Sequence, residues 1–448
     1  MKRNTHLGQA LVPVLFVMVA MTSIAAITTL AARQEAENAS RSLDEDRAWF
    51  IEQGAVTYIA NELEDNTQGG TLPADLPVDS NADGNGWTPM GIGWYKATVI
   101  DTASRIDINT AAQNVLGQLS VFQEQPDLLE ALLDWRGTMP NDSLENYYQS
   151  LNPPYDSKRA FIDTPEELLL IQGFTPDILY SVQSSTAANN APNPFSQMGM
   201  PQGGQATVSN NTLPLIEMIT PYSGELNVDS NGNQRVNITT APVNALETGL
   251  GVPANIANQI VQWRSQNGHR FNTIADLLNV TGINQKLLAT FADEATVSTT
   301  QLLPGRVNVN TAPIDVLTAA FNGDQTLAQL IVNSRSSGTT FNSLNDLFNL
   351  DGLSVPQLRT LATTACVKSS FYLIRIKVRL PDDNVTHAAE AVVFLPQIPN
   401  QNSSASPAGQ LDNQNTSTSN PAPLIIQFHQ VPRDPGWSEW VDPSTFNQ

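Results

Sequence analysis

The longest uninterrupted apolar run of the chain lies near its beginning. No residue from Ala10 to Ala32 is charged. At about 1.5 Å of rise per residue, a helix of that length crosses a hydrocarbon core of about 30 Å. Lys2 and Arg3 precede the run, and no acid does. After the run acids outnumber basic residues, with Glu35, Glu37, Asp44, Glu45 and Asp46 against Arg33 and Arg41. This asymmetry predicts a single membrane span over residues 10–32, with a cytoplasmic N-terminus and the bulk of the chain outside.

The helical pattern continues beyond the membrane segment. Apolar residues recur at helical spacing along one broad stripe, with acids opposite, at Ala48, Phe50, Ile51, Ala55, Val56, Tyr58, Ile59 and Leu63. We therefore predict one N-terminal helix over residues 9–67, half in lipid and half in water.

Alternating apolar and polar positions predict strands in two distant parts of the chain. One strand is expected at 93–103, a hairpin at 371–396 and a third strand at 423–431. A single sheet head is therefore predicted from residues 88–104 and 371–431, completed from both sides of a large insertion. Residues 397–422 form a Ser/Asn/Pro-rich linker and residues 432–448 a tail.

The insertion contains three copies of one signature. "RIDINTA" begins at Arg105, "RVNITTA" at Arg235 and "RVNVNTA" at Arg306, and each is followed by an amphipathic run that ends in arginine. A Phe-led second signature then begins at Phe161, Phe271 and Phe341. This pattern predicts three helical modules of helix-hairpin-helix or SAM-like type, at 105–184, 212–300 and 301–370, with a linker at 185–211. The fold class is α+β.

A glycine-lined turn joins the expected helices of the second module, in "GLGVPANIANQI". Such a turn can present backbone amides to a phosphate, and Arg235–Ile283 resembles the modules of ComEA-like DNA receptors. Charge argues against nucleic acid as a partner: the chain has a net charge of −21, and residues 235–365 carry seven Lys/Arg against eight Asp/Glu. The modules are expected to be protein-interaction scaffolding, and a membrane-anchored DNA receptor for DNA uptake is the alternative.

The candidate chemistry is sparse. Cys366 is the single cysteine, and the four histidines are scattered outside any catalytic motif, so we expect no enzyme. One turn-rich loop has the alternating oxygens of a calcium site, at Asp79, Asn81, Asp83 and Asn85. Position twelve of that loop is Met90 rather than a bidentate glutamate, and a solvated turn is the alternative interpretation.

A small residue, Gly8, stands immediately before the apolar run. This arrangement resembles the leaders of type IV pilins and pseudopilins, which implies cleavage by a prepilin peptidase between Gly8 and Gln9. Residues 1–8 would be the leader, and the apolar helix would stay on the mature protein. A secretory signal peptide or a plain anchor is the alternative.

The first module differs from the others by an insertion between Arg136 and Phe161. The segment resembles the general secretion pathway protein K family, the large minor pseudopilins of type II secretion. The residues that carry the resemblance are Trp135, Glu145, Tyr148, Pro153-Pro154-Tyr155, Phe161, Glu166-Glu167-Leu168 and Gly173.

The resemblance implies a structural subunit at the tip of a pseudopilus that supports export of folded proteins across the outer membrane. It implies other minor pseudopilins and the major pseudopilin as partners, besides the prepilin peptidase. It also makes Asp134, Asp142 and Glu145 candidate calcium ligands. Arg136 departs from the family, which tends to carry an acid there. The fifth residue after Gly8 is Pro13 rather than the glutamate of shaft subunits.

Overall fold

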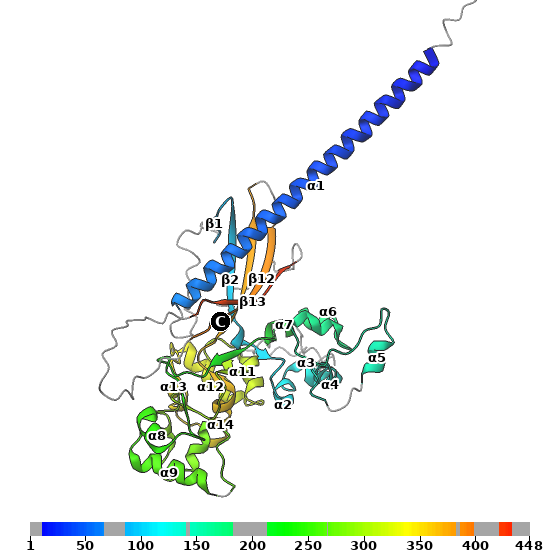
Figure 1. Ribbon diagram of the computed structural model, residues 1–448. Coiled ribbons are helices and arrows are strands. Elements are labelled where there is room, and N and C mark those ends of the chain that lie inside the picture. Colours follow the sequence, from blue (N-terminus) through cyan, green and yellow to red (C-terminus); the bar gives the residue numbers. More distant parts are fainter. Residues whose placement is uncertain are drawn as a thin grey trace, which may run out of the picture.

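The computed structural model describes residues 11–66, 86–139, 144–181, 213–266, 268–381, 386–397 and 421–431. A single long helix extends from a small sheet head, and the helical modules lie beyond the end of the head that is farther from the helix N-terminus (Figure 1). The predicted α+β class is confirmed. A long apolar helix, an antiparallel sheet and inserted helical modules are all present.

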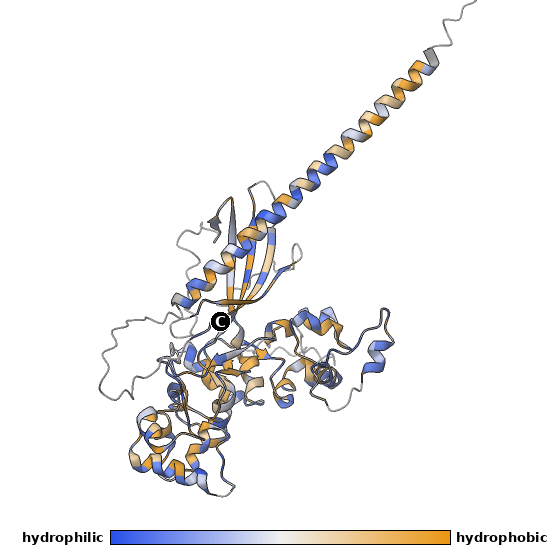
Figure 2. Cartoon of the chain, viewed as in Figure 1, coloured by the Kyte–Doolittle hydropathy of each residue, from blue (hydrophilic) through white to orange (hydrophobic). Residues whose placement is uncertain are grey.

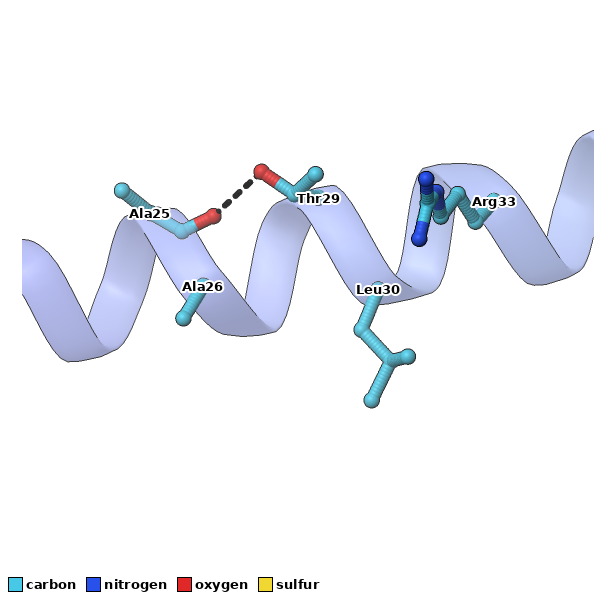
Figure 3. A pocket seen from close by; sticks show the side chains of 5 residues that line it. All are labelled: Ala25, Ala26, Thr29, Leu30 and Arg33. Atoms are coloured by element: carbon cyan, nitrogen blue, oxygen red, sulfur yellow. Dashed lines mark hydrogen bonds between the residues drawn. The ribbon is translucent and has the colours of Figure 1, made fainter.

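Helix α1 spans Leu11–Asn66. Its first half is apolar (Figure 2). By length and composition the helix is long and apolar enough to cross a membrane, and none of its most apolar stretch is buried inside the protein. Hydroxyls in this half donate to carbonyls three or four residues earlier, as Thr29 does to Ala25 at 2.7 Å. The shallow hollow around these residues (Figure 3) is lined by α1 alone, so it is part of the helix surface rather than a ligand site.

The second half of α1 packs on the sheet. Its buried positions follow the helical repeat, at Ala48, Ile51, Ala55, Val56, Ile59, Ala60 and Leu63. The prediction of the buried stripe is wrong for two of its residues. Phe50 and Tyr58 are 68% and 41% exposed, because both positions fall outside the arc of the helix that faces the sheet. Glu52 lies in the contact instead, where Gln430 donates to its carboxylate at 2.9 Å.

The head is a five-stranded antiparallel sheet in the order β1-β2-β11-β12-β13. The strands are β1 Thr88–Met90, β2 Gly93–Asp101, β11 Phe371–Arg379, β12 Thr386–Phe394 and β13 Leu424–Val431. Pairing of β2 with β11 joins the two sides of the insertion, from Tyr372↔Asp101 to Arg379↔Trp94. The hairpin and third strand are therefore confirmed. The hairpin turn (382–385), most of the 397–422 linker and the 432–448 tail lie outside the described residues.

The alternation predicted for β11 sets the two faces of the sheet. Tyr372, Ile374, Ile376 and Val378 are fully buried and share one core with α1. The intervening side chains, among them Arg375 and Arg379, lie on the opposite face. That core is separate from the larger core of the modules.

The elements of the modules are short. After the 3₁₀ turn η1 (Thr102–Ser104), the first module contains β3 Ile106–Asp107, α2 Gln113–Leu116, α3 Ser120–Glu124, α4 Pro126–Trp135, α5 Glu145–Gln149, η2 Pro165–Leu170, α6 Pro176–Tyr180, α7 Leu215–Met218 and β4 Ile219–Thr220. The second contains β6 Val236–Asn237, α8 Val243–Leu250, α9 Ala254–Ser265, η3 Ile274–Asn279, α10 Gln285–Leu288 and β7 Ala295–Thr296. The third contains β9 Val307–Asn308, α11 Ile314–Ala320, α12 Gln325–Ser336, α13 Leu344–Phe348, α14 Val355–Thr364 and β10 Ala365–Cys366. Two further strands form an antiparallel pair: β5 Gly224–Leu226 precedes the second module in the chain, and β8 Leu302–Pro304 follows it.

Each module is closed by a two-residue parallel strand pair. We call the seven-residue signatures that begin at Arg105, Arg235 and Arg306 the heptapeptides. The strand inside each heptapeptide pairs with a strand at the end of the same module, as β3–β4, β6–β7 and β9–β10. The structure therefore places Leu215–Thr220 in the first module, whereas the sequence pattern assigned these residues to the second. The sequence pattern did not show this pairing, because α7 and β4 follow the 185–211 linker, whereas α6 and β3, which they contact, precede it.

The third module lies between the other two. Its helix α11 contacts α2 of the first module, while α13 and α14 contact α10 and η3 of the second. This arrangement makes the third module the structural centre of the insertion.

Candidate functional site

The three heptapeptides fold into the same loop. The third residue accepts a hydrogen bond from the backbone N–H two positions later, with distances of 2.8 Å for Asp107, 2.9 Å for Asn237 and 3.0 Å for Asn308. The fourth residue donates its N–H to the closing strand, at 2.9, 2.9 and 3.0 Å. The repeated Asp/Asn is therefore the side chain that turns the chain from a strand into a helix.

The arginine at the end of each amphipathic run holds that loop in place. Its guanidinium donates to the carbonyls of the fourth and seventh heptapeptide residues. The pairs are Arg136 with Ile108 and Ala111 (2.8 and 2.9 Å), Arg264 with Ile238 and Ala241 (2.8 and 2.6 Å), and Arg335 with Val309 and Ala312 (3.1 and 2.9 Å). We call Arg136, Arg264 and Arg335 the clamp arginines. Their recurrence explains why two distant signatures repeat together, since one supplies the donors and the other the acceptors.

The arginine that opens each heptapeptide has a different role, since it pairs with acids, which are buried in the second and third modules. Arg235 bonds Glu225 at 2.9 Å and Asp293 at 3.1 Å. Arg306 bonds the same Glu225 at 2.7 Å. The shared carboxylate therefore ties the second and third modules to each other. These pairs fix orientation more than they add stability, because removing the charges from water offsets much of their attraction.

The second repeated signature begins one residue later in the first module than the sequence suggested. The residue at this core position is Ile162, fully buried, where the other modules have Phe271 and Phe341, and Phe161 is 46% exposed. Both Ile162 and Phe341 donate their N–H to a heptapeptide asparagine, at 2.8 and 3.0 Å. The identity of the phenylalanines suggested the wrong alignment, and hydrogen bonding sets the right one.

The family-like residues of the first module pack together. The Trp135 ring lies 5.3 Å from that of Tyr148 and 6.3 Å from that of Tyr155, and its Nε1 donates to Glu167 at 2.7 Å. Burial raises the pKa of Tyr148 to about 12, so its hydroxyl stays protonated. These aromatic residues form the structural centre of the inserted segment.

The candidate calcium ligands do not converge within the described residues. Asp134 is buried and bonds Arg159 at 3.3 Å, which is an ion pair rather than an open ligand. Glu145 is half-buried and accepts from Ser157 N at 3.0 Å and from Gln149, and these hydrogen bonds lower its pKa. The described part of the chain contains no group of three or more His, Cys, Asp or Glu placed to hold a metal ion.

Several candidate site residues lie outside the described residues. They are Gly8, Gln9, Asp79, Asn81, Asp83, Asn85 and Asp142. Calcium binding and leader cleavage therefore remain predictions from the sequence.

The hairpin turns were the candidate phosphate sites. In the second module, Gly251 has φ of +65° and turns the chain from α8 toward α9. In the third module, the Asp324 carboxylate caps α12, accepting from Leu327 N at 2.9 Å and from Gln357 at 2.9 Å. A carboxylate occupies the helix N-terminus where a phosphate would bind.

One carboxylate joins the modules to the head. Asp101 ends β2 and is buried, and it accepts hydrogen bonds from Asn308 and Thr311 of the third module, both at 2.7 Å. Burial raises the pKa of Asp101 despite these bonds. The third heptapeptide therefore connects its own module to the sheet.

A row of charges makes a second connection. Arg105 of the first module bonds Glu217, which also accepts from Arg375 of β11 at 3.1 Å. Arg375 bonds Glu390 of β12 at 2.7 Å. The third module is thus fixed to the end of β2 that lies far from the membrane half of α1 (Figure 1), and the first module to the middle of β11, on the sheet face opposite α1.

The first heptapeptide has a titratable group where the other two have asparagine, which gives a pH prediction. Burial raises the pKa of Asp107 to about 6. A carboxyl with a raised folded-state pKa stabilises the fold fully below its unfolded pKa and loses that contribution as the pH rises through about 6. We expect Asp107→Asn to be more stable than the natural chain by about 1–3 kcal/mol at neutral pH, and by about 1 kcal/mol or less near pH 4.5.

Denaturant unfolding of both proteins at the two pH values measures this difference. Asn237 and Asn308 show that an asparagine can make the same turn. An equal gain at both pH values would contradict the assignment to Asp107.

A long N-terminal helix packed along an antiparallel sheet defines a pilin-like subunit, here carrying helical modules between two strands of its head. Family comparison agrees with this class. Residues 100–189 and 307–367 each match a model described as type II secretion system (T2SS), protein K, and residues 231–296 match a helix-hairpin-helix motif. The chain belongs to the type II secretion system protein K (GspK) family.

A similar solved structure is titled "The Crystal Structure of the GspK-GspI-GspJ complex from enterotoxigenic Escherichia coli Type 2 Secretion System". The matched chain shares 10% identity with a TM-score of 0.44, covering 88% of this chain and 99% of that one. No curated protein matches the chain.

Proposed function

We propose that this protein is a non-enzymatic minor pseudopilin at the tip of a type II secretion pseudopilus. It supports export of folded proteins across the outer membrane. A prepilin peptidase cleaves between Gly8 and Gln9, and α1 then anchors the subunit in the inner membrane with its N-terminus cytoplasmic and its head periplasmic. Its partners are other minor pseudopilins and the major pseudopilin, as the family suggests.

The position of the modules is the observation that carries the proposal. They lie beyond the far end of the head's strands, and the second and third modules extend past the last turn of α1 (Figure 1). In a shaft of repeating subunits, each head must leave room along the axis for the subunit ahead of it. Modules in that space suit a subunit with neighbours behind it and none ahead.

Association with other pseudopilins tests the proposal. We expect the full-length protein, extracted in detergent, to co-purify with the other minor pseudopilins of its own secretion system. The major subunit should not replace them. Incorporation throughout the shaft, without binding any minor subunit, would contradict a tip position.

The alternative function, a DNA receptor, has one observation in its favour, the helix-hairpin-helix match over residues 231–296. The capping of α12 by Asp324 and the seven Lys/Arg against eight Asp/Glu in residues 235–365 oppose it. We expect residues 35–448 to show no binding to duplex DNA in a gel-shift assay at physiological salt. A micromolar shift that weakens steeply with added salt would favour the receptor.

A further inference from the structure

Strand β13 forms one edge of the head sheet, and its outer side has no strand partner among the described residues. Its eight residues include no Asp, Glu, Lys or Arg. Edge strands usually carry such charges, or are covered, because their free N–H and C=O groups attract other strands. At the opposite edge, β1 covers the first residues of β2, and the strand that continues beyond them carries Lys96 and Asp101.

The first part of β13 is also apolar on its surface. Leu424, Ile425 and Ile426 are 55%, 39% and 41% exposed. The register with β12 shifts between Val392 and Val393, which leaves Ile426 as an extra, bulged residue. A bulge often hinders the pairing of an edge strand with another strand. The bulged residue here is an isoleucine, however, so the surface at the bulge stays apolar.

The second part of β13 is firmly held, and it can therefore act as a template. His429 pairs with Glu390 across the sheet at 3.4 Å, and Gln430 donates to Glu52 of α1 at 2.9 Å. Phe428 packs against the head core. Residues 427–431 therefore present a fixed row of backbone groups beside the exposed isoleucines.

We propose that the open edge of β13 is a docking site for another pseudopilin of the same secretion system, which adds an extended, apolar segment as a sixth strand. Main-chain hydrogen bonds to residues 427–431 supply pairing, and Leu424, Ile425 and Ile426 supply apolar contact. This inference rests on the proposed function and names the surface through which the head assembles.

The test uses full-length protein in detergent with the purified minor pseudopilins of its own system. We expect Ile426→Lys to weaken the complex about tenfold or more, because the added charge would be buried at the interface. Ile92→Lys is the matched control, since Ile92 is 53% exposed beside the opposite edge, and it should bind as the natural chain does. Amide hydrogen exchange of residues 427–431 should slow when the complex forms.

Each other outcome overturns the inference. A complex that forms without protection of residues 427–431, or that tolerates Ile426→Lys, leaves the proposed function standing but places docking elsewhere. Protection of β13 in the isolated protein at high concentration would mean that a second copy occupies the edge. No complex with any pseudopilin would overturn both proposals together.

Discussion

Arg335→Ala is expected to destabilise the modules by about 2–4 kcal/mol, since two hydrogen bonds from a charged donor are lost and two carbonyls keep no replacement. The Arg335 guanidinium bonds Val309 and Ala312, and no carboxylate pairs with it among the described residues. Its loss would release the third heptapeptide, which also connects to Asp101 of the head. The effect should therefore exceed that of a typical surface arginine.

Arg359→Ala is the matched control in the same module. Arg359 is 46% exposed and bonds Asp276 at 3.2 Å, a pair for which we expect a loss below about 1 kcal/mol. Arg335→Lys separates charge from geometry, because a lysine can supply the charge but not the planar fork of donors. We expect the lysine variant to recover less than half of the loss.

Denaturant unfolding of the three variants measures these differences. Equal losses for Arg335→Ala and Arg359→Ala would refute the clamp as the reason that the signatures repeat.

Gly8→Ala is expected to abolish processing and leave the unprocessed chain in the membrane. The small residue before the apolar run is what marks the cleavage position in the pilin-like leader. Bulkier substitutions should behave in the same way. Immunoblotting of membrane fractions would show a single, larger species for the variant.

Pro13→Leu is the contrasting variant. Shaft subunits carry a glutamate at this mature position, where it can pair with the amine of the subunit ahead, and an unpartnered charge in lipid is costly. Pro13 offers no charge, and a proline is tolerated in the first turn of a helix. We expect Pro13→Leu to leave processing and secretion close to normal. Secretion lost through this single change would contradict a subunit that needs nothing at that position.

Much of the architecture followed from local pattern. Period-two alternation predicted β11 and its partners, and the uncharged run predicted the first half of α1, because burial against a sheet or lipid acts on each residue directly. The face of α1 that packs on the sheet was predicted only in part, since apolar Phe50 and Tyr58 are exposed and polar Glu52 is buried. Composition cannot tell which flank of a helix meets a sheet.

Apart from the sheet that is completed from both sides of the insertion, contacts across long sequence distances could not be predicted. The sequence shows that arginines recur, but not that the clamp arginines bond carbonyls 23–28 residues earlier. The closure of the first module by Leu215–Thr220 requires pairing across the linker, which leaves no periodic signal. Asp101 at the junction looked like an ordinary strand end, because its partners, Asn308 and Thr311, lie more than 200 residues away.

The N-terminus of the mature protein tests the central claim most directly. Mass spectrometry of the full-length protein, extracted from membranes, would determine it. A pseudopilin cut by a prepilin peptidase begins at Gln9 and keeps the apolar helix. A mature chain that begins near Ala32 would mean an ordinary signal peptide and would contradict the assignment of this protein to the pseudopilus.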